Sequence, residues 1–200
     1  MDYKDIKSGD TEVYEAVKKY NEDEEFTYAD YEKWDDGKRY ELIDGFAYMM
    51  SAPSTAHQSI LTELSRQFAN YLKGRPCRVF PAPYDVCLNG LGDKDKDVVQ
   101  PDIIIICNES IIDKKRCNGA PDMAIEILSP STSKMDLFIK LEKYQKAGVR
   151  EYWIVDPDAQ TVNVNLLENS HYVVTSYECG DTIAVAVLDG CNITLMDVFE

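Results

Sequence analysis

Short runs of consecutive apolar residues mark the middle of the chain. The clearest are Val98–Cys107 and Met123–Leu128, which are nearly continuous in apolar residues. Strands buried on both faces of a sheet have this pattern, whereas half-exposed strands alternate apolar and polar residues. Arg78–Leu88 is rich in Val, Phe and Tyr, and Glu151–Val155 is a further expected strand before Asp156-Pro157. These segments predict the strands of a central sheet.

Helical periodicity appears in two segments. Apolar residues recur at three- and four-residue spacing within Ile60–Leu72, which predicts one long amphipathic helix. A second helix is expected to begin at a capping box formed by Ser133 and Asp136. It should continue to about Ala147, where Gly148 ends it.

Turn signals predict hairpins on both sides of this region. Asp44-Gly45 divides Tyr40–Met50 into two strands, and turns near Glu168-Asn169 and Gly180-Asp181 divide the end of the chain. A T-x-x-D capping box also predicts a short helix over Tyr28–Trp34. The fold class that follows is α+β, with a central mixed β-sheet flanked by helices and with extra β-hairpins.

Charge is unevenly distributed over the 200 residues. The net charge is −15; residues 1–36 hold 13 acidic and 5 basic side chains, and the rest of the chain holds 23 and 16. We therefore expect residues 1–25 to be an acidic N-terminal tail or helix, followed by a single domain over residues 26–200. The acidic body argues against a broad phosphate-binding surface. Neither a membrane span nor a signal peptide is evident, so a cytoplasmic protein is expected.

The six cysteines do not form a metal-binding pattern. None are spaced as C-x-x-C, and no histidine stands at zinc-ligand spacing from any of them. In a reducing cytoplasm we expect free thiols, several of them buried as small apolar side chains.

Two carboxylates interrupt the buried strands. Glu126 is the ionisable residue of Met123–Leu128, and Asp102 directly precedes Ile103–Ile106. A buried carboxylate needs a cation, a metal ion or hydrogen-bond donors to offset its desolvation. Two such groups on adjacent strands suit Mg²⁺ or Mn²⁺, which prefer oxygen ligands. The alternative for each carboxylate alone is a structural hydrogen-bond acceptor.

Lys140 follows Glu126 on the second predicted helix. It lies at the edge of the apolar stripe formed by Leu137, Leu141 and Tyr144, so its long side chain can reach the end of the sheet. The alternative is a surface ion pair with Asp136, four residues earlier. Periodicity alone favours the surface pair.

Five strings stand in order along the chain: YELIDG (40–45), QPDI (100–103), EILSPST (126–132), KLEKY (140–144) and GVREYWIVDP (148–157). Together they resemble the Uma-two restriction endonuclease family of the PD-(D/E)XK superfamily. The PD half-motif falls on Pro101-Asp102 and the second acidic position on Glu126. Leu128 stands where the simple motif has lysine. In this family the lysine appears on the following helix, where Lys140 matches it, while Lys143 and Lys146 match surface positions.

The resemblance implies a restriction-endonuclease-like fold and a metal-dependent phosphodiester hydrolase acting on DNA, expected to be a homodimer. Asp102, Glu126, the Ile127 carbonyl and Glu41 are expected to hold Mg²⁺ or Mn²⁺. Lys140 is expected to orient the attacking water.

Two further residues rank below these. His57 matches a family histidine, with a helix-entry hydrogen bond as its alternative, and Glu63 ranks below Glu41 as an acidic site residue. Two alternatives to an active endonuclease remain open. One is a catalytically idle homologue that binds nucleic acid or regulates, and the other is a purely structural domain.

Overall fold

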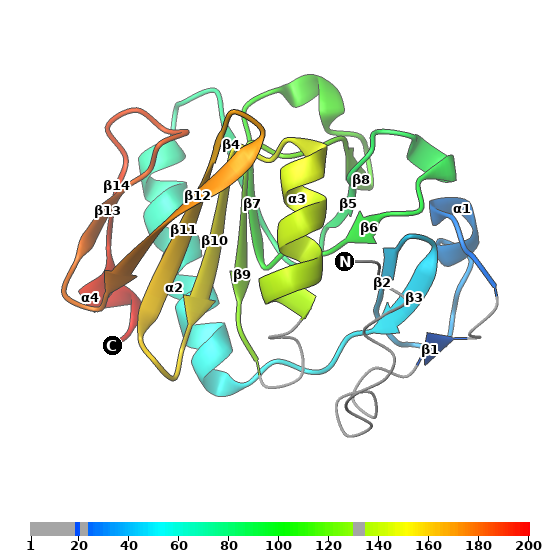
Figure 1. Ribbon diagram of the computed structural model, residues 1–200, viewed down its shortest axis with the longest axis horizontal. Coiled ribbons are helices and arrows are strands. Elements are labelled where there is room, and N and C mark those ends of the chain that lie inside the picture. Colours follow the sequence, from blue (N-terminus) through cyan, green and yellow to red (C-terminus); the bar gives the residue numbers. More distant parts are fainter. Residues whose placement is uncertain (1–18, 21–23, 130–134) are drawn as a thin grey trace.

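The computed structural model describes residues 19–20, 24–129 and 135–200. Two six-stranded mixed sheets and a separate two-stranded sheet make up its β structure (Figure 1). Helices are packed on these sheets, in agreement with the predicted α+β class. Among the described residues, no helix is long and apolar enough to cross a membrane.

The central sheet has the strand order β12-β11-β10-β9-β7-β4. Its strands are β4 (Arg78–Pro81), β7 (Ile103–Ile106), β9 (Met123–Ile127), β10 (Glu151–Asp156), β11 (Thr161–Glu168) and β12 (His171–Glu178). Strands β9 and β10 are parallel and the other neighbours are antiparallel. The all-buried β7 and β9 are interior strands between β10 and β4, as their continuous apolar sequences predicted.

The second sheet, called here the hairpin sheet, has the order β1-β3-β2-β6-β5-β8. Its strands are β1 (Lys19–Tyr20), β2 (Tyr40–Ile43), β3 (Phe46–Met49), β5 (Asp85–Cys87), β6 (Val98–Val99) and β8 (Arg116–Asn118). The β2–β3 hairpin turns at Asp44-Gly45 as predicted, and both turn residues have positive φ. The remaining two-stranded sheet joins β13 (Thr182–Ala184) to β14 (Asn192–Thr194).

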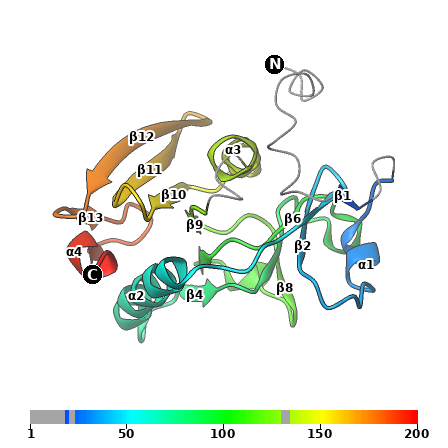
Figure 2. The same cartoon turned by 90° about the horizontal axis from the view of Figure 1, so that it is seen from below.

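Two helices cover opposite faces of the central sheet (Figure 2). Helix α2 (Thr55–Leu72) packs on the face that Ile103, Ile125 and Trp153 occupy, together with the C-terminal segment. Helix α3 (Leu141–Ala147) packs on the other face through Tyr144. We call these the α2 face and the α3 face.

The remaining helical elements are short. They are α1 (Tyr28–Tyr31), α4 (Leu195–Val198), the 3₁₀ turns Gly92–Lys94 and Glu109–Ile111, and the π-helical segment η4 (Met135–Lys140). The capping box predicted before α1 is present, although α1 ends earlier than Trp34. Helix α3 ends at Gly148, which has φ 87° as predicted for a helix terminator. The predicted Ser133 capping box lies outside the described residues.

One predicted strand is wrong in a way that matters for function. Val98–Cys107 is two strands in two different sheets, because the chain leaves β6 of the hairpin sheet and enters β7 of the central sheet. The break falls around Pro101, which has no N–H to donate to a sheet ladder. Asp102 therefore lies where the two sheets meet.

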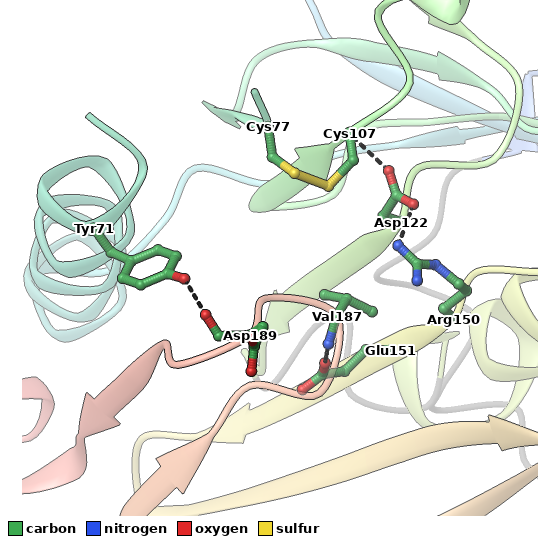
Figure 3. Close-up of a disulfide and its surroundings, with 8 residues drawn as sticks. All are labelled: Tyr71, Cys77, Cys107, Asp122, Arg150, Glu151, Val187 and Asp189. Atoms are coloured by element: carbon green, nitrogen blue, oxygen red, sulfur yellow. Dashed lines mark hydrogen bonds and ion pairs between the residues drawn. A yellow bond between two sulfur atoms is a disulfide. The ribbon is translucent and has the colours of Figure 1, made fainter. Parts of the chain in front are cut away.

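The expectation of free thiols is wrong for two cysteines. Cys77 and Cys107 form a disulfide beside β4 and β7 (Figure 3). The β4–β7 register pairs Arg78 with Ile106. Cys77, just before β4, therefore lies opposite Cys107, just after β7, with their Cα atoms 4.0 Å apart. Their sequence separation of 30 gave no sign of this. Of the four free cysteines, all but Cys179 are buried, as expected for small apolar side chains.

Candidate active site

Glu126 lies in the middle of the molecule on β9. It shares the α3 face with Ala124, because alternate strand residues point to the same side. Its side chain is 5% exposed, and its Oε1 accepts a hydrogen bond of 2.7 Å from the Tyr144 hydroxyl of α3. The Lys140 ammonium lies 2.9 Å from the same oxygen. Glu126 is therefore a buried carboxylate with a charged partner.

Lys140 is the last residue of the π-helical segment, directly before α3. Its side chain is only 3% exposed, and its Nζ lies 2.9 Å from Oε1 of Glu126 and 2.9 Å from Oε1 of Glu41. Periodicity favoured a surface position for Lys140, and that interpretation is wrong. A π-helical turn offsets the helix face relative to an α-helix, and such turns are frequent at functional sites.

Glu41 comes to the site from the hairpin sheet, on β2. It is buried, and besides Lys140 it accepts a 2.8 Å hydrogen bond from the backbone N–H of Gln100. Lys140 thus joins a carboxylate of the hairpin sheet to a carboxylate of the central sheet. The sequence pattern alone gave no reason to place Glu41 beside Lys140.

Asp102 lies next to this cluster, at the start of β7. The β7–β9 register pairs Ile103 with Ile125, so one further step along both strands places Asp102 opposite Glu126. Its Oδ2 accepts a 2.7 Å hydrogen bond from the Ile127 N–H. Its side chain is 15% exposed, and its Oδ1 has no hydrogen-bond partner in the part of the chain that the structure describes. Asp102 thus offers an oxygen atom at the more open side of the cluster.

His57 reaches Asp102 from the first turn of α2. Its Nε2 lies 3.1 Å from Oδ2 of Asp102, while its backbone N–H donates to Ser54 Oγ at the helix start. The His57 side chain therefore lies at the cluster, and its backbone takes part in the helix start. Its Nδ1 is buried and makes no hydrogen bond to the described residues.

The tyrosine beside Glu126 is held in its protonated form. Complete burial, followed by the negative charge of Glu126, raises the pKa of Tyr144 well above its usual value. The hydroxyl therefore stays a hydrogen-bond donor to Glu126 over the physiological pH range. Tyr144 was predicted only as a residue of the apolar helix face, so its contact with Glu126 is a role that the sequence analysis missed.

The sequence analysis also missed Gln100, whose backbone N–H donates to Glu41. The side-chain amide of Gln100 donates to Asp85 Oδ1 at 2.7 Å and to the Tyr31 hydroxyl at 3.0 Å. Burial raises the pKa of Asp85, against hydrogen bonds that lower it. Gln100 stands directly before Pro101-Asp102 in the sequence, which is the signal that could have identified it.

Other candidates lie elsewhere or differ from expectation. Glu63 is on α2 and makes a surface ion pair with Arg66, so it does not join the cluster. Lys146 is exposed and pairs with Glu142, as expected for a surface position. Lys143 was also expected at the surface, but its side chain is only 16% exposed, so that expectation is wrong.

The donor chemistry of the cluster suits a hard divalent cation. Asp102 and Glu126 supply carboxylate oxygens on neighbouring strands, and Mg²⁺ is commonly held by one or two carboxylates together with water. Within the described residues, no three His, Cys, Asp or Glu side chains are arranged around one metal position. Glu41 instead holds Lys140, and its Oε1 also accepts the hydrogen bond from the Gln100 N–H. The residues fit a metal bound chiefly by two carboxylates.

The chain is similar in sequence and in structure to known proteins. Residues 28–196 match the Uma2 family, described as "Putative restriction endonuclease". The uncharacterized protein slr1290 of Synechocystis sp. is 23% identical over 160 residues, covering 77% of this chain and 81% of that protein. A crystal structure from Anabaena variabilis, described as a "putative nuclease belonging to DUF820", superimposes with a TM-score of 0.70 at 23% identity and covers 87% of this chain and 97% of that one. The family match confirms the resemblance seen in the sequence, and the structural match confirms the restriction-endonuclease-like fold.

Proposed function

We propose that this chain, which belongs to the Uma2 family, hydrolyses phosphodiester bonds in DNA with the help of Mg²⁺ or Mn²⁺. The observation that carries the proposal is the position of Lys140. Its ammonium is shared by Glu41 and Glu126 at the junction of the two sheets, next to Asp102. The PD-(D/E)XK resemblance implies that Asp102, Glu126 and Lys140 belong to one site with Glu41 as an additional ligand, and the proximity of these residues supports the proposal.

In this proposal, Asp102 and Glu126 hold the metal ion with the Ile127 carbonyl, and Glu41 is a further ligand or the partner that orients Lys140. A bound Mg²⁺ supplies polarisation of the phosphate and a lower pKa for its water. Lys140 donates hydrogen bonds to the attacking water and offsets negative charge that develops on the phosphate oxygens. The Ile127 N–H and His57 fix the Asp102 carboxylate through Oδ2.

The acidic character of the protein favours one alternative. A net charge of −15 opposes the approach of a polyanion, which suits a homologue that keeps the fold but does not cleave. Such a protein would bind metal or nucleic acid without turnover.

Because cutting both strands needs two sites, the active form is proposed to be a homodimer, and light scattering of the purified protein tests this.

A cleavage assay on supercoiled plasmid and on labelled single- and double-stranded oligonucleotides tests the function. Cleavage by the wild type should require Mg²⁺ or Mn²⁺ and disappear with a chelator. Lys140→Gln should lower the rate about 10²- to 10³-fold, as expected when a charge-stabilising donor is lost. Lys146→Gln, an exposed lysine of the same helix, is the matched control and should cleave like the wild type.

Calorimetric titration of Mn²⁺ separates the alternatives if no DNA is cleaved. Binding that Asp102→Asn abolishes, without turnover, would identify an idle homologue. No Mn²⁺ binding, with or without DNA, would leave the carboxylates as structural groups and contradict the proposal.

A further inference from the structure

Lys143 is one turn beyond Lys140 and makes its own pair of ionic contacts. Its Nζ lies 2.9 Å from Oδ1 of Asp97 and also forms an ion pair with Oδ1 of Asp44. Asp44 is the first residue of the β2–β3 turn, and Asp97 directly precedes β6. One side chain of α3 therefore holds two separate segments of the hairpin sheet.

The acceptors of this contact are fixed by other bonds. Oδ1 of Asp97 accepts a 2.8 Å hydrogen bond from the Asp44 N–H, and its Oδ2 accepts one of 3.0 Å from the Asn89 amide. Burial opposes ionisation of Asp97, but these bonds and the Lys143 ammonium outweigh it and lower its pKa. Burial likewise opposes the charge on Lys143, yet the two carboxylates raise its pKa. The contact is an ionised, preorganised cluster.

This cluster lies beside the segments that deliver the site residues. Lys140 and Lys143 are three residues apart on the helix, and their partners Glu41 and Asp44 are three residues apart on the hairpin. Beyond Asp97, the chain continues through β6 to the break that places Asp102. Loss of the Lys143 contact would remove ion pairs that reinforce the Lys140–Glu41 contact in holding the helix to the hairpin.

We propose that Lys143 is a positioning residue, which holds α3 against the β2–β3 hairpin so that the Lys140 ammonium remains shared between Glu41 and Glu126. It acts through Lys140 and does not itself contact substrate. Its effect on catalysis rests on the proposed function, whereas its effect on the position of Lys140 does not. The two parts of the inference therefore need two measurements.

The first measurement compares steady-state cleavage by Lys143→Gln, Lys143→Arg and Lys146→Gln. A displaced catalytic group lowers turnover while DNA binding remains, so Lys143→Gln should lower kcat about 10- to 100-fold with little change in KM. Lys143→Arg keeps the positive charge and should recover most of the loss. Lys146→Gln removes an exposed charge from the same helix and should match the wild type.

The second measurement observes the lysine side-chain ammonium groups by ¹H–¹⁵N NMR in the absence of metal and DNA. The Lys140 signal is identified by its loss in Lys140→Gln. It should shift or broaden in Lys143→Gln and remain unchanged in Lys146→Gln. A changed Lys140 signal in a protein that cleaves no DNA would support the positioning role and contradict the proposed function.

The proposal is overturned if the Lys140 signal and the turnover of Lys143→Gln both match those of Lys146→Gln. It is also overturned if Lys143→Arg is as impaired as Lys143→Gln while circular dichroism shows both folded, since the loss would then not depend on the charge. Should Lys143→Gln fail to fold, Asp44→Asn replaces it, because that variant retains the Asp97 contact. A smaller change in turnover and in the Lys140 signal is then expected. If neither changes, the proposal is overturned.

Discussion

Two buried glutamates on adjacent parallel strands have opposite surroundings. Glu126 on β9 points to the α3 face and contacts the Lys140 ammonium and the Tyr144 hydroxyl. Glu151 on β10 points to the α2 face and is fully buried. Its Oε1 accepts a 2.7 Å hydrogen bond from the Trp153 indole, and its Oε2 accepts one of 3.0 Å from the Val187 N–H, as Figure 3 shows for Val187.

The difference shows that burial does not identify a functional carboxylate. Glu151 is satisfied by neutral donors and ties the C-terminal segment to the central sheet. Burial raises its pKa, against these donors. Its two oxygens accept the Trp153 and Val187 hydrogen bonds, which is a structural role. Glu126 shares a cation with a second carboxylate and lies opposite an accessible aspartate. What separates the two residues is the charge and accessibility of their neighbours.

The largest expected effect is on cleavage. Glu126→Gln should lower the cleavage rate about 10²- to 10³-fold, because it removes charge that the metal ion and Lys140 require. Glu151→Gln should cleave within a few-fold of the wild type at temperatures where circular dichroism shows it folded. Equal losses in the two variants would mean that the comparison does not separate a site from a structural contact.

Stability should respond in the opposite way. Glu151→Ala removes the acceptor of the buried Trp153 indole and of the part-buried Val187 N–H, which should lower the free energy of unfolding by about 2–5 kcal/mol. Urea denaturation measures this. Glu168→Ala, an exposed glutamate at the end of β11, is the control and should change stability by less than about 0.5 kcal/mol. A loss no larger than that of the control would show that Glu151 is not the anchor of the C-terminal segment.

The smallest expected effect is in the pH dependence of stability, where Glu151 and Asp97 should differ in sign. The pKa of Glu151 is raised above its ordinary value of 4.5, so its contribution to stability is lost as pH rises above that value. The pKa of Asp97 is lowered below 3.8, so its contribution is lost as pH falls below that value.

Urea denaturation of the wild type, Glu151→Gln and Asp97→Asn at several pH values tests the sign. As pH rises above 4.5, the free energy of unfolding of the wild type should fall relative to that of Glu151→Gln. As pH falls below 3.8, the free energy of unfolding of the wild type should fall relative to that of Asp97→Asn. Slopes of the same sign would contradict the assignment of the two environments.

Much of the central sheet was evident in the sequence, because local chemistry specifies its elements. The continuous apolar runs identified β7 and β9, the 3.6-residue period identified α2, and Asp44-Gly45 identified the first hairpin. The split between β6 and β7 was not evident. Apolar residues stand on both sides of the Gln100-Pro101-Asp102 segment, and only the pairing of β6 with β2 and β5 assigns β6 to the hairpin sheet.

The sequence analysis named the residues that the structure brings together in the candidate site, but it did not predict which of them contact one another. The resemblance to a known family pointed to Asp102, Glu126, Lys140 and Glu41, while periodicity placed Lys140 at the surface. Lys140 is four residues before Tyr144, and both side chains reach Oε1 of Glu126, although Lys140 stood at the edge of the apolar stripe. Lys143 was expected at the surface because it matches a surface position of the family, but its side chain is largely buried and pairs with two carboxylates.

The sequence by itself determined the fold class, most of the strands and helices, and the residue types available for chemistry, because these depend on local pattern and composition. Only the tertiary structure decided which charged groups meet. Lys140 joins Glu41 to Glu126 across two sheets, and Cys77 bonds to Cys107 across two strands. These contacts depend on sheet pairing and register between residues far apart in the chain, which no local pattern encodes.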